Sequence, residues 1–271
     1  MRTLSALLFG VVMLTAGAQT ANAHFVWLVF EPAERPTSVK LYFGETAAPD
    51  DPDLLDRVAT ATAVVVPGRR GEPKTLAFEK RYDALVADFP ANARPAPVVL
   101  RQTYGVVSRG DGPFLLKYYA KAYPSALPGT WDTVADSDLL PLEIVPKLDG
   151  SSMIFEVLWK GRPASGATVT VHGPELDAAL EGMTDERGLF RAALPGAGLY
   201  SVRARRIEMT AGERGGKKYD SIRHYSTLSL NVRPPQLLPV AHNWPSLPRG
   251  VTSFGAAIAG RPTLRLRRSL R

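Results

Sequence analysis

The stretch MIFEVLWKGRPASGATVTV, residues 153–171, decides the fold of this chain. Its first half alternates large apolar residues with other side chains, a period of two that is typical of a β-strand with one buried face. Glycine, proline and serine over residues 161–167 then predict a turn, and the run Thr168–Val171 predicts a second strand. The stretch therefore indicates two strands joined by a turn.

The same pattern recurs on both sides of this stretch. Short apolar or alternating runs are separated by turn signals rich in proline and glycine. They predict strands at residues 25–30, 39–43, 58–66, 75–78, 84–89, 98–107, 114–122, 139–145, 189–193, 200–205 and 225–232. Between two of them, residues 184–188 predict a turn in which Gly188 takes a positive φ.

One segment departs from the strand pattern. Asp51 precedes Pro52, and this order predicts an N-cap followed by a proline in the first turn of a short helix. Asp50, Asp51, Asp53 and Asp56 lie together here, but the glycine and glutamate of a calcium loop are missing. We therefore interpret these acids as a helix start, where negative charge is favourable.

The first residues of the chain predict export. Arg2 is followed by the apolar run 4–16 and by Ala21-Asn22-Ala23, the small-x-small pattern of a signal-peptide cleavage site. We predict a signal peptide over residues 1–23, with His24 as the mature first residue. The apolar run is too short for a permanent span of about 20 residues, and no later segment is a candidate for one. We expect a protein of the periplasm or cell surface that does not span the membrane after cleavage.

Composition narrows the chemistry. The chain has no cysteine, so disulfides, thiolate metal ligands and cysteine nucleophiles are excluded. Its formal net charge of +7 is concentrated at the end, where residues 261–271 contain five arginines. No aromatic-basic motif indicates nucleic-acid binding, and the common signatures of hydrolases, phosphate-binding loops and zinc proteases are absent.

A polar joint at residues 146–152 divides the strands into two segments. The motifs of the second segment are Gly161-Arg162-Pro163, Gly166-Ala167-Thr168-Val169, Thr184-Asp185, Gly188-Leu189-Phe190, and Pro195 with Gly198-Leu199-Tyr200. With them the segment resembles the carboxypeptidase-regulatory, Cna-B or transthyretin-like β-sandwich modules. We therefore predict an all-β chain of two consecutive β-sandwich domains (immunoglobulin/transthyretin-like), at residues 24–147 and 150–233, and a Pro/Arg-rich tail at 234–271.

Further motifs lie in both segments: Ala23-His24 before Trp27-Leu28, Leu41–Glu45, Phe114–Leu116 with Tyr118–Lys121, Tyr219–Ser221 and His224–Leu228. With these motifs, residues 24–233 resemble a bacterial periplasmic family, a domain of unknown function that is often described as associated with nickel uptake. The resemblance implies metal handling at the cell envelope and supplies no catalytic residues.

The tail contains a further resemblance. Trp244–Pro248 and Val251–Ala257 are similar to the entry of a kelch propeller blade, after which the sequence turns to arginines. A single blade cannot bury its faces alone. We therefore expect a truncated or frameshifted kelch domain here.

Two histidines are the candidate metal ligands. After cleavage His24 would offer its α-amine and a ring nitrogen to one ion, the arrangement called a histidine brace, and nitrogen ligands suit copper or nickel. His224 is the candidate second ligand, because strand parity places it on the inward face with Ser226, Leu228 and Leu230. The alternative for His224 is a structural histidine satisfied by hydrogen bonds.

These observations favour one function and leave two alternatives. The favoured function is an exported metal-binding accessory protein for a copper or nickel ion, without catalytic activity of its own, whose partner is a metal transporter or a cell-envelope component. The first alternative is a structural or adhesive module that presents the lost propeller. The second is a copper oxygenase-like enzyme that uses the N-terminal histidine.

Overall fold

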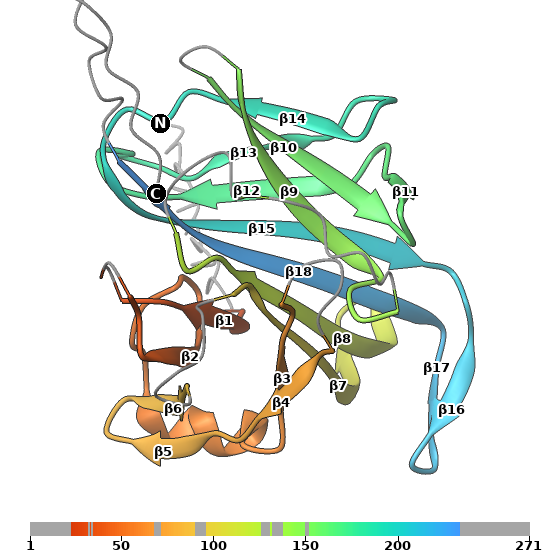
Figure 1. Cartoon of the computed structure of the whole chain (residues 1–271). Coiled ribbons are helices and arrows are strands. Elements are labelled where there is room, and N and C mark those ends of the chain that lie inside the picture. The colour runs from red at the N-terminus through yellow and green to blue at the C-terminus, as the bar shows by residue number, and fades with distance from the viewer. Residues whose placement is uncertain are drawn as a thin grey trace, which may run out of the picture. The chain divides into compact units, whose positions relative to one another are not determined.

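The computed structural model describes residues 23–31, 33, 35–67, 72–89, 96–125, 131, 138–149 and 152–233. Nearly all regular structure in these residues is β-strand, which confirms the predicted all-β fold (Figure 1). No helix among these residues is long and apolar enough to cross a membrane. Residues 1–22 of the predicted signal peptide and the tail with its kelch-like fragment lie outside the described residues.

Each predicted run overlaps a strand, whereas the strands at residues 79–81, 162–163, 180–183, 212–214 and 217–219 were not predicted. The first segment contains β1 (Phe25–Val29), β2 (Ser38–Gly44), the short 3-10 helix η1 (Pro52–Val58), β3 (Thr62–Val65), β4 (Lys74–Leu76), β5 (Glu79–Arg81), β6 (Ala84–Asp88), β7 (Val98–Arg109) and β8 (Gly112–Ala122). The second contains β9 (Leu142–Asp149), β10 (Ser152–Trp159), β11 (Arg162–Pro163), β12 (Thr168–His172), β13 (Leu180–Met183), β14 (Leu189–Ala192), β15 (Gly198–Glu208), β16 (Gly212–Arg214), β17 (Lys217–Tyr219) and β18 (Ser221–Val232).

One eight-stranded sheet contains strands of both segments. Its order is β13-β12-β15-β18-β8-β7-β3-β4. The two segments meet where β18 and β8 pair in parallel, from Ser221 opposite Phe114 to Ser229 opposite Ala122. All other pairs in this sheet are antiparallel. The two segments therefore share a sheet through this parallel pair, a connection that we did not predict.

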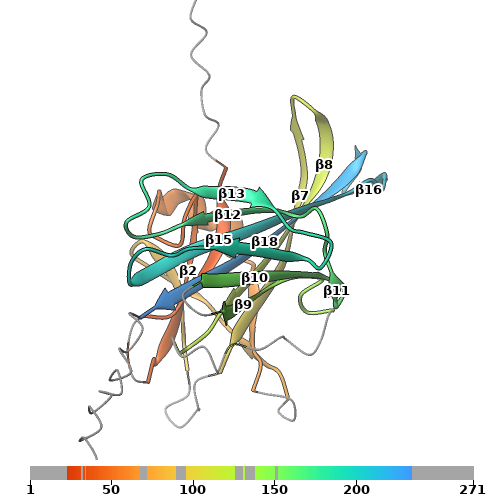
Figure 2. The same cartoon turned by 90° about the horizontal axis from the view of Figure 1, so that it is seen from above.

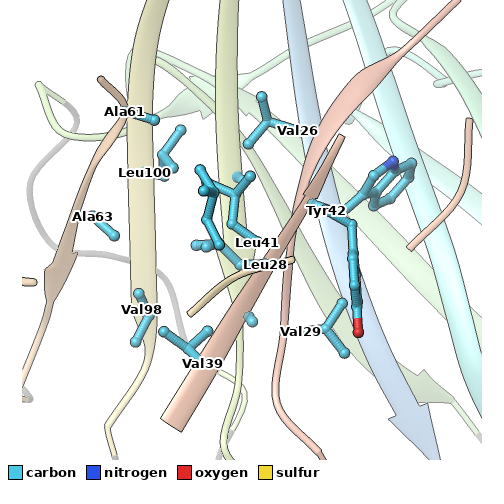
Figure 3. Packing of buried hydrophobic residues seen from close by; sticks show 14 of the residues in the cluster. Val26, Leu28, Val29, Val39, Leu41, Tyr42, Ala61, Ala63, Val98 and Leu100 are labelled. Carbon is cyan, nitrogen blue, oxygen red and sulfur yellow. The ribbon is translucent and has the colours of Figure 1, made fainter. Parts of the chain in front are cut away.

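Each face of this large sheet carries its own hydrophobic core. On one face, the sheet β1-β2-β6-β5 covers a core that includes Trp27, Leu41 and Leu100. Figure 3 shows Leu28 and Leu41 in the space between their strands and Leu100 of β7. On the other face, strands β9, β10, β11 and β14 cover a second core that includes Phe155.

Strand β18 contacts both cores because its side chains alternate between the two faces. Leu228 and Leu230 are buried in the second core. The hydroxyl groups of Thr227 and Ser229, on the other face, donate hydrogen bonds to backbone carbonyls of β1, with 2.6 Å between Thr227 Oγ1 and the Val26 oxygen. These bonds attach β1, and with it the residues at its start, to the large sheet.

Strand β9 lies differently from our expectation. We expected a strand at residues 139–145 to close the first sandwich. Instead β9 pairs with β10 over its whole length, and Leu142 and Ile144 belong to the second core. The reason is local, since β9 continues through most of the predicted joint at residues 146–152, and strands that follow each other closely in the chain pair most readily with each other. Figure 2 shows β9 and β10 side by side, with the β7–β8 hairpin extending beyond them.

The turn at residues 184–188 has the predicted conformation. Gly188 has a φ of +74°. Its backbone N–H donates to the Asp185 carbonyl at 2.9 Å, and its carbonyl accepts from the Val157 N–H at 2.8 Å. A Cβ atom at this position would lie 2.7 Å from the Val157 oxygen. The turn therefore needs glycine both for its positive φ and for its close approach to β10.

We expect Gly188→Ala to destabilise the protein more than Gly216→Ala does. Both glycines have nearly the same φ, +74° and +73°, so the conformational cost of about 1–2 kcal/mol is shared. A Cβ at Gly216 would meet no atom within 4 Å, whereas at Gly188 it would meet backbone. The difference in unfolding free energy, measured by urea denaturation, should be about 1 kcal/mol or more. Equal losses of unfolding free energy in the two variants would contradict the close approach of Gly188 to the backbone of β10.

Candidate functional site

His24 lies directly before β1, at the edge of the first core. The hydroxyl of Tyr118, on β8, donates a hydrogen bond to the His24 carbonyl with an O–O distance of 2.8 Å. The imidazole lies beside the ring of Phe43, with 5.6 Å between the ring centres, and its side chain is 25% exposed. The backbone of His24 is thus fixed to the large sheet, while its ring remains accessible from outside.

The loop that leads into η1 brings an acid next to this ring. Asp50 Oδ2 lies 3.5 Å from His24 Nε2, and Asp50 Oδ1 accepts the backbone N–H of Asp51 at 2.8 Å. Asp51 in turn caps the helix, because its Oδ1 accepts the N–H of Asp53 at 3.0 Å. The predicted helix start is confirmed. Sequence reasoning did not connect Asp50 with His24.

Aromatic rings line the interior next to His24. Tyr118 is surrounded by Phe25, Phe43, Tyr104 and Tyr225, with ring centres 5.7–6.4 Å from its own. Burial raises the pKa of the Tyr118 hydroxyl, so this group stays protonated and remains a donor to the His24 carbonyl. In the sequence, the adjacent tyrosines at 118 and 119 could have indicated that the strand presents a tyrosine to each face of the sheet, because neighbouring residues on a strand point to opposite sides.

His224 occupies a different environment. It is 2% exposed, and both ring nitrogens have partners. Nδ1 lies 2.9 Å from the Tyr119 hydroxyl and Nε2 lies 3.1 Å from Glu208 Oε2. The ring also contacts Trp159 edge-on, with 4.6 Å between ring centres. Burial lowers the pKa of His224 to about 4, although Glu208 acts in the opposite direction.

His24 and His224 lie on opposite faces of the large sheet. Tyr118, which binds the His24 carbonyl, is in the first core, whereas Tyr119, which contacts His224, is in the second. Strand parity thus gave the correct inward face for His224, with Leu228 and Leu230. The structure does not bring the two rings together, because the shared sheet lies between them.

Of the two remaining histidines, only His172 lies among the residues that the structure describes. His172 is the last residue of β12 and is half-buried. Burial, and secondarily Arg203, lower the pKa of His172. His242 lies outside the described residues. Within the part of the chain that the structure describes, no three His, Asp or Glu side chains form a cluster suited to a metal ion.

Comparisons with known proteins place the chain in a family. Among solved structures, a two-domain fibronectin type III segment of chicken tenascin is similar at 11% identity and a TM-score of 0.17, over 73% of this chain and 95% of that chain. A search of curated proteins found no match. The family model "Domain of unknown function (DUF4198)" matches residues 21–208, which is more than half of the sequence. The chain therefore belongs to the DUF4198 family.

Proposed function

We propose that this protein is an exported metal-binding protein that holds copper or nickel through His24 and hands the ion on at the cell envelope. The observation that supports this most is the Tyr118 hydrogen bond to the His24 carbonyl, which fixes the residue while its ring stays 25% exposed. A terminal residue is ordinarily poorly ordered unless it is tied down. A fixed backbone with a partly exposed imidazole is what a terminal chelate requires.

The donor atoms fit these metals. Once the bond between Ala23 and His24 is cut, the α-amine and a ring nitrogen of one residue can bind the same ion. Nitrogen donors suit copper and nickel, and the affinity of such sites for divalent ions peaks at copper. The resemblance to proteins associated with nickel uptake adds nickel as the second candidate, and a metal transporter or a cell-envelope component as the partner.

The low number of candidate ligands among the described residues favours transfer over permanent storage. Structural metal sites are closed by four protein ligands, whereas sites with open positions accept further ligands. His224 lies on the other face of the sheet with both nitrogens engaged, so His24 is the anchor that we assign in this proposal. An ion held by one residue keeps open positions that a receiving protein can occupy.

The test compares two forms of the mature protein by calorimetry with copper(II) and nickel(II). We expect the form that begins at His24 to bind one ion tightly, and a form extended by an acetyl group on the α-amine of His24 to bind about 100-fold more weakly or worse, because the α-amine is lost from the chelate.

His224→Gln in the form that begins at His24 is the matched control. It should bind the ion as tightly as the parent, since the sheet separates residue 224 from the site. Equal binding by the authentic and extended forms would contradict the proposal.

A further inference from the structure

We propose that Asp50 is a positioning residue that sets the tautomer of His24 and leaves Nδ1 as the ring nitrogen for the metal. This inference rests on the proposed function, because it concerns the same site. Asp50 does not bind the metal in this proposal. Its contact with the imidazole determines which ring nitrogen of His24 is left to bind the metal.

The carboxylate of Asp50 is held in place by its own backbone. Oδ1 accepts the N–H of Asp51 at 2.8 Å, which leaves Oδ2 facing His24 Nε2 at 3.5 Å. Asp51 is itself fixed as the N-cap of η1 by its bond to the Asp53 N–H. Asp50 is therefore oriented toward the imidazole by a chain of short-range contacts.

A glycine provides the space for this approach. A Cβ atom at Gly44 would lie 3.0 Å from both Cβ and Oδ2 of Asp50, closer than side chains ordinarily come. The carbonyl of Gly44 accepts a hydrogen bond from Trp27 Nε1 at 3.0 Å, which fixes the end of β2. The absence of a side chain at Gly44 thus leaves room for Asp50 where it passes the strand, and a Cβ there would displace Asp50 by a few tenths of an ångström.

The chemistry follows from the imidazole itself. A neutral ring carries one N–H, and an acceptor at one nitrogen draws the proton there and leaves a lone pair on the other. Asp50 beside Nε2 favours the Nε2–H tautomer, so the lone pair is on Nδ1. Only Nδ1 is near enough to the α-amine of the same residue to close a small chelate ring. Histidine ligands commonly donate their second N–H to a carboxylate in this way.

The first measurement uses metal-free protein that begins at His24. In alkaline buffer, ¹⁵N NMR should show Nε2–H on His24 in the parent. In Asp50→Asn, the side-chain oxygen can still accept from Asp51, while its N–H faces Nε2 and favours the Nδ1–H tautomer. Asp53→Asn, a change of the same kind in the same segment, should leave the tautomer of His24 unchanged.

The second measurement is copper(II) binding by the same variants. We expect Asp50→Asn to weaken binding about 10–100-fold, as is usual for loss of such a partner, and Gly44→Ala to weaken it less. Thermal melting should confirm that the variants are folded. A parent tautomer that persists in Asp50→Asn, or a changed tautomer with unchanged affinity, would overturn this inference. Failure of the parent itself to bind metal would instead overturn the proposed function, with the NMR result still deciding the role of Asp50.

Discussion

Replacing Trp27 with alanine should lower the free energy of unfolding by about 4 kcal/mol. The side chain is 0% exposed, lies in the first core, and donates its indole N–H to the Gly44 carbonyl at 3.0 Å. Removal of a buried tryptophan typically costs 3–5 kcal/mol, roughly, through lost burial and the remaining cavity. Urea denaturation of the parent and the variant measures this difference.

Two further variants separate the causes. Trp27→Phe keeps an aromatic ring but loses the indole donor, so it should cost about 1–2 kcal/mol from the hydrogen bond and the smaller volume. Met209→Ala removes a large residue that is 82% exposed and should change stability by less than about 0.5 kcal/mol. A loss below about 1 kcal/mol in Trp27→Ala would show that β1 does not pack in the core as described.

The strands could be predicted because each depends on local alternation. Val39, Leu41 and Phe43 alternate with polar or amphipathic neighbours, and all three are buried in β2. The parallel pair of β8 and β18 could not be predicted in this way. Register joins Tyr118 to Tyr225, which are far apart in the sequence, and alternation within a strand does not specify which strand lies next to it.

Of the residues at the candidate site, only His24 could be predicted from the sequence. His24 was identifiable because it follows a cleavage pattern, and His224 could be assigned to the correct face of its strand. Whether the rings of His24 and His224 meet depends on which faces of the shared sheet they occupy, and only the three-dimensional fold determines this. Asp50 was hidden for the same reason, since the pairing of β1 with β2 places Phe25 opposite Gly44, next to which Asp50 passes.

Acid should destabilise this protein through His224. The ring faces Tyr119 and Lys117 from β8 and Glu208 and Arg206 from β15. It also faces Trp159 at the end of β10 and Lys160 in the turn that follows. In its neutral form, Nδ1 accepts from the Tyr119 hydroxyl and Nε2–H donates to Glu208. Protonation puts a hydrogen on Nδ1, where it opposes the Tyr119 donor, and adds a buried positive charge near Lys117 and Lys160.

The sign and size of the effect follow from the pKa. In the folded protein the pKa of His224 is lowered to about 4, from an ordinary value of 6.5. Between these values the unfolded chain binds more protons than the folded one, so stability rises with pH. The contribution of His224 is complete above about pH 6.5. It is lost as the pH falls toward 4, which amounts to about 3 kcal/mol.

Urea denaturation between pH 7 and pH 4 tests this prediction in the parent and in His224→Gln. Glutamine does not titrate, and its amide N–H can still donate to Glu208. Carboxylates that do not contact residue 224 affect both proteins alike, so the informative quantity is the difference in unfolding free energy between parent and variant. That difference should move by about 3 kcal/mol in favour of the variant as the pH falls. A difference that stays constant with pH would mean that His224 is protonated as readily in the folded chain as in the unfolded one.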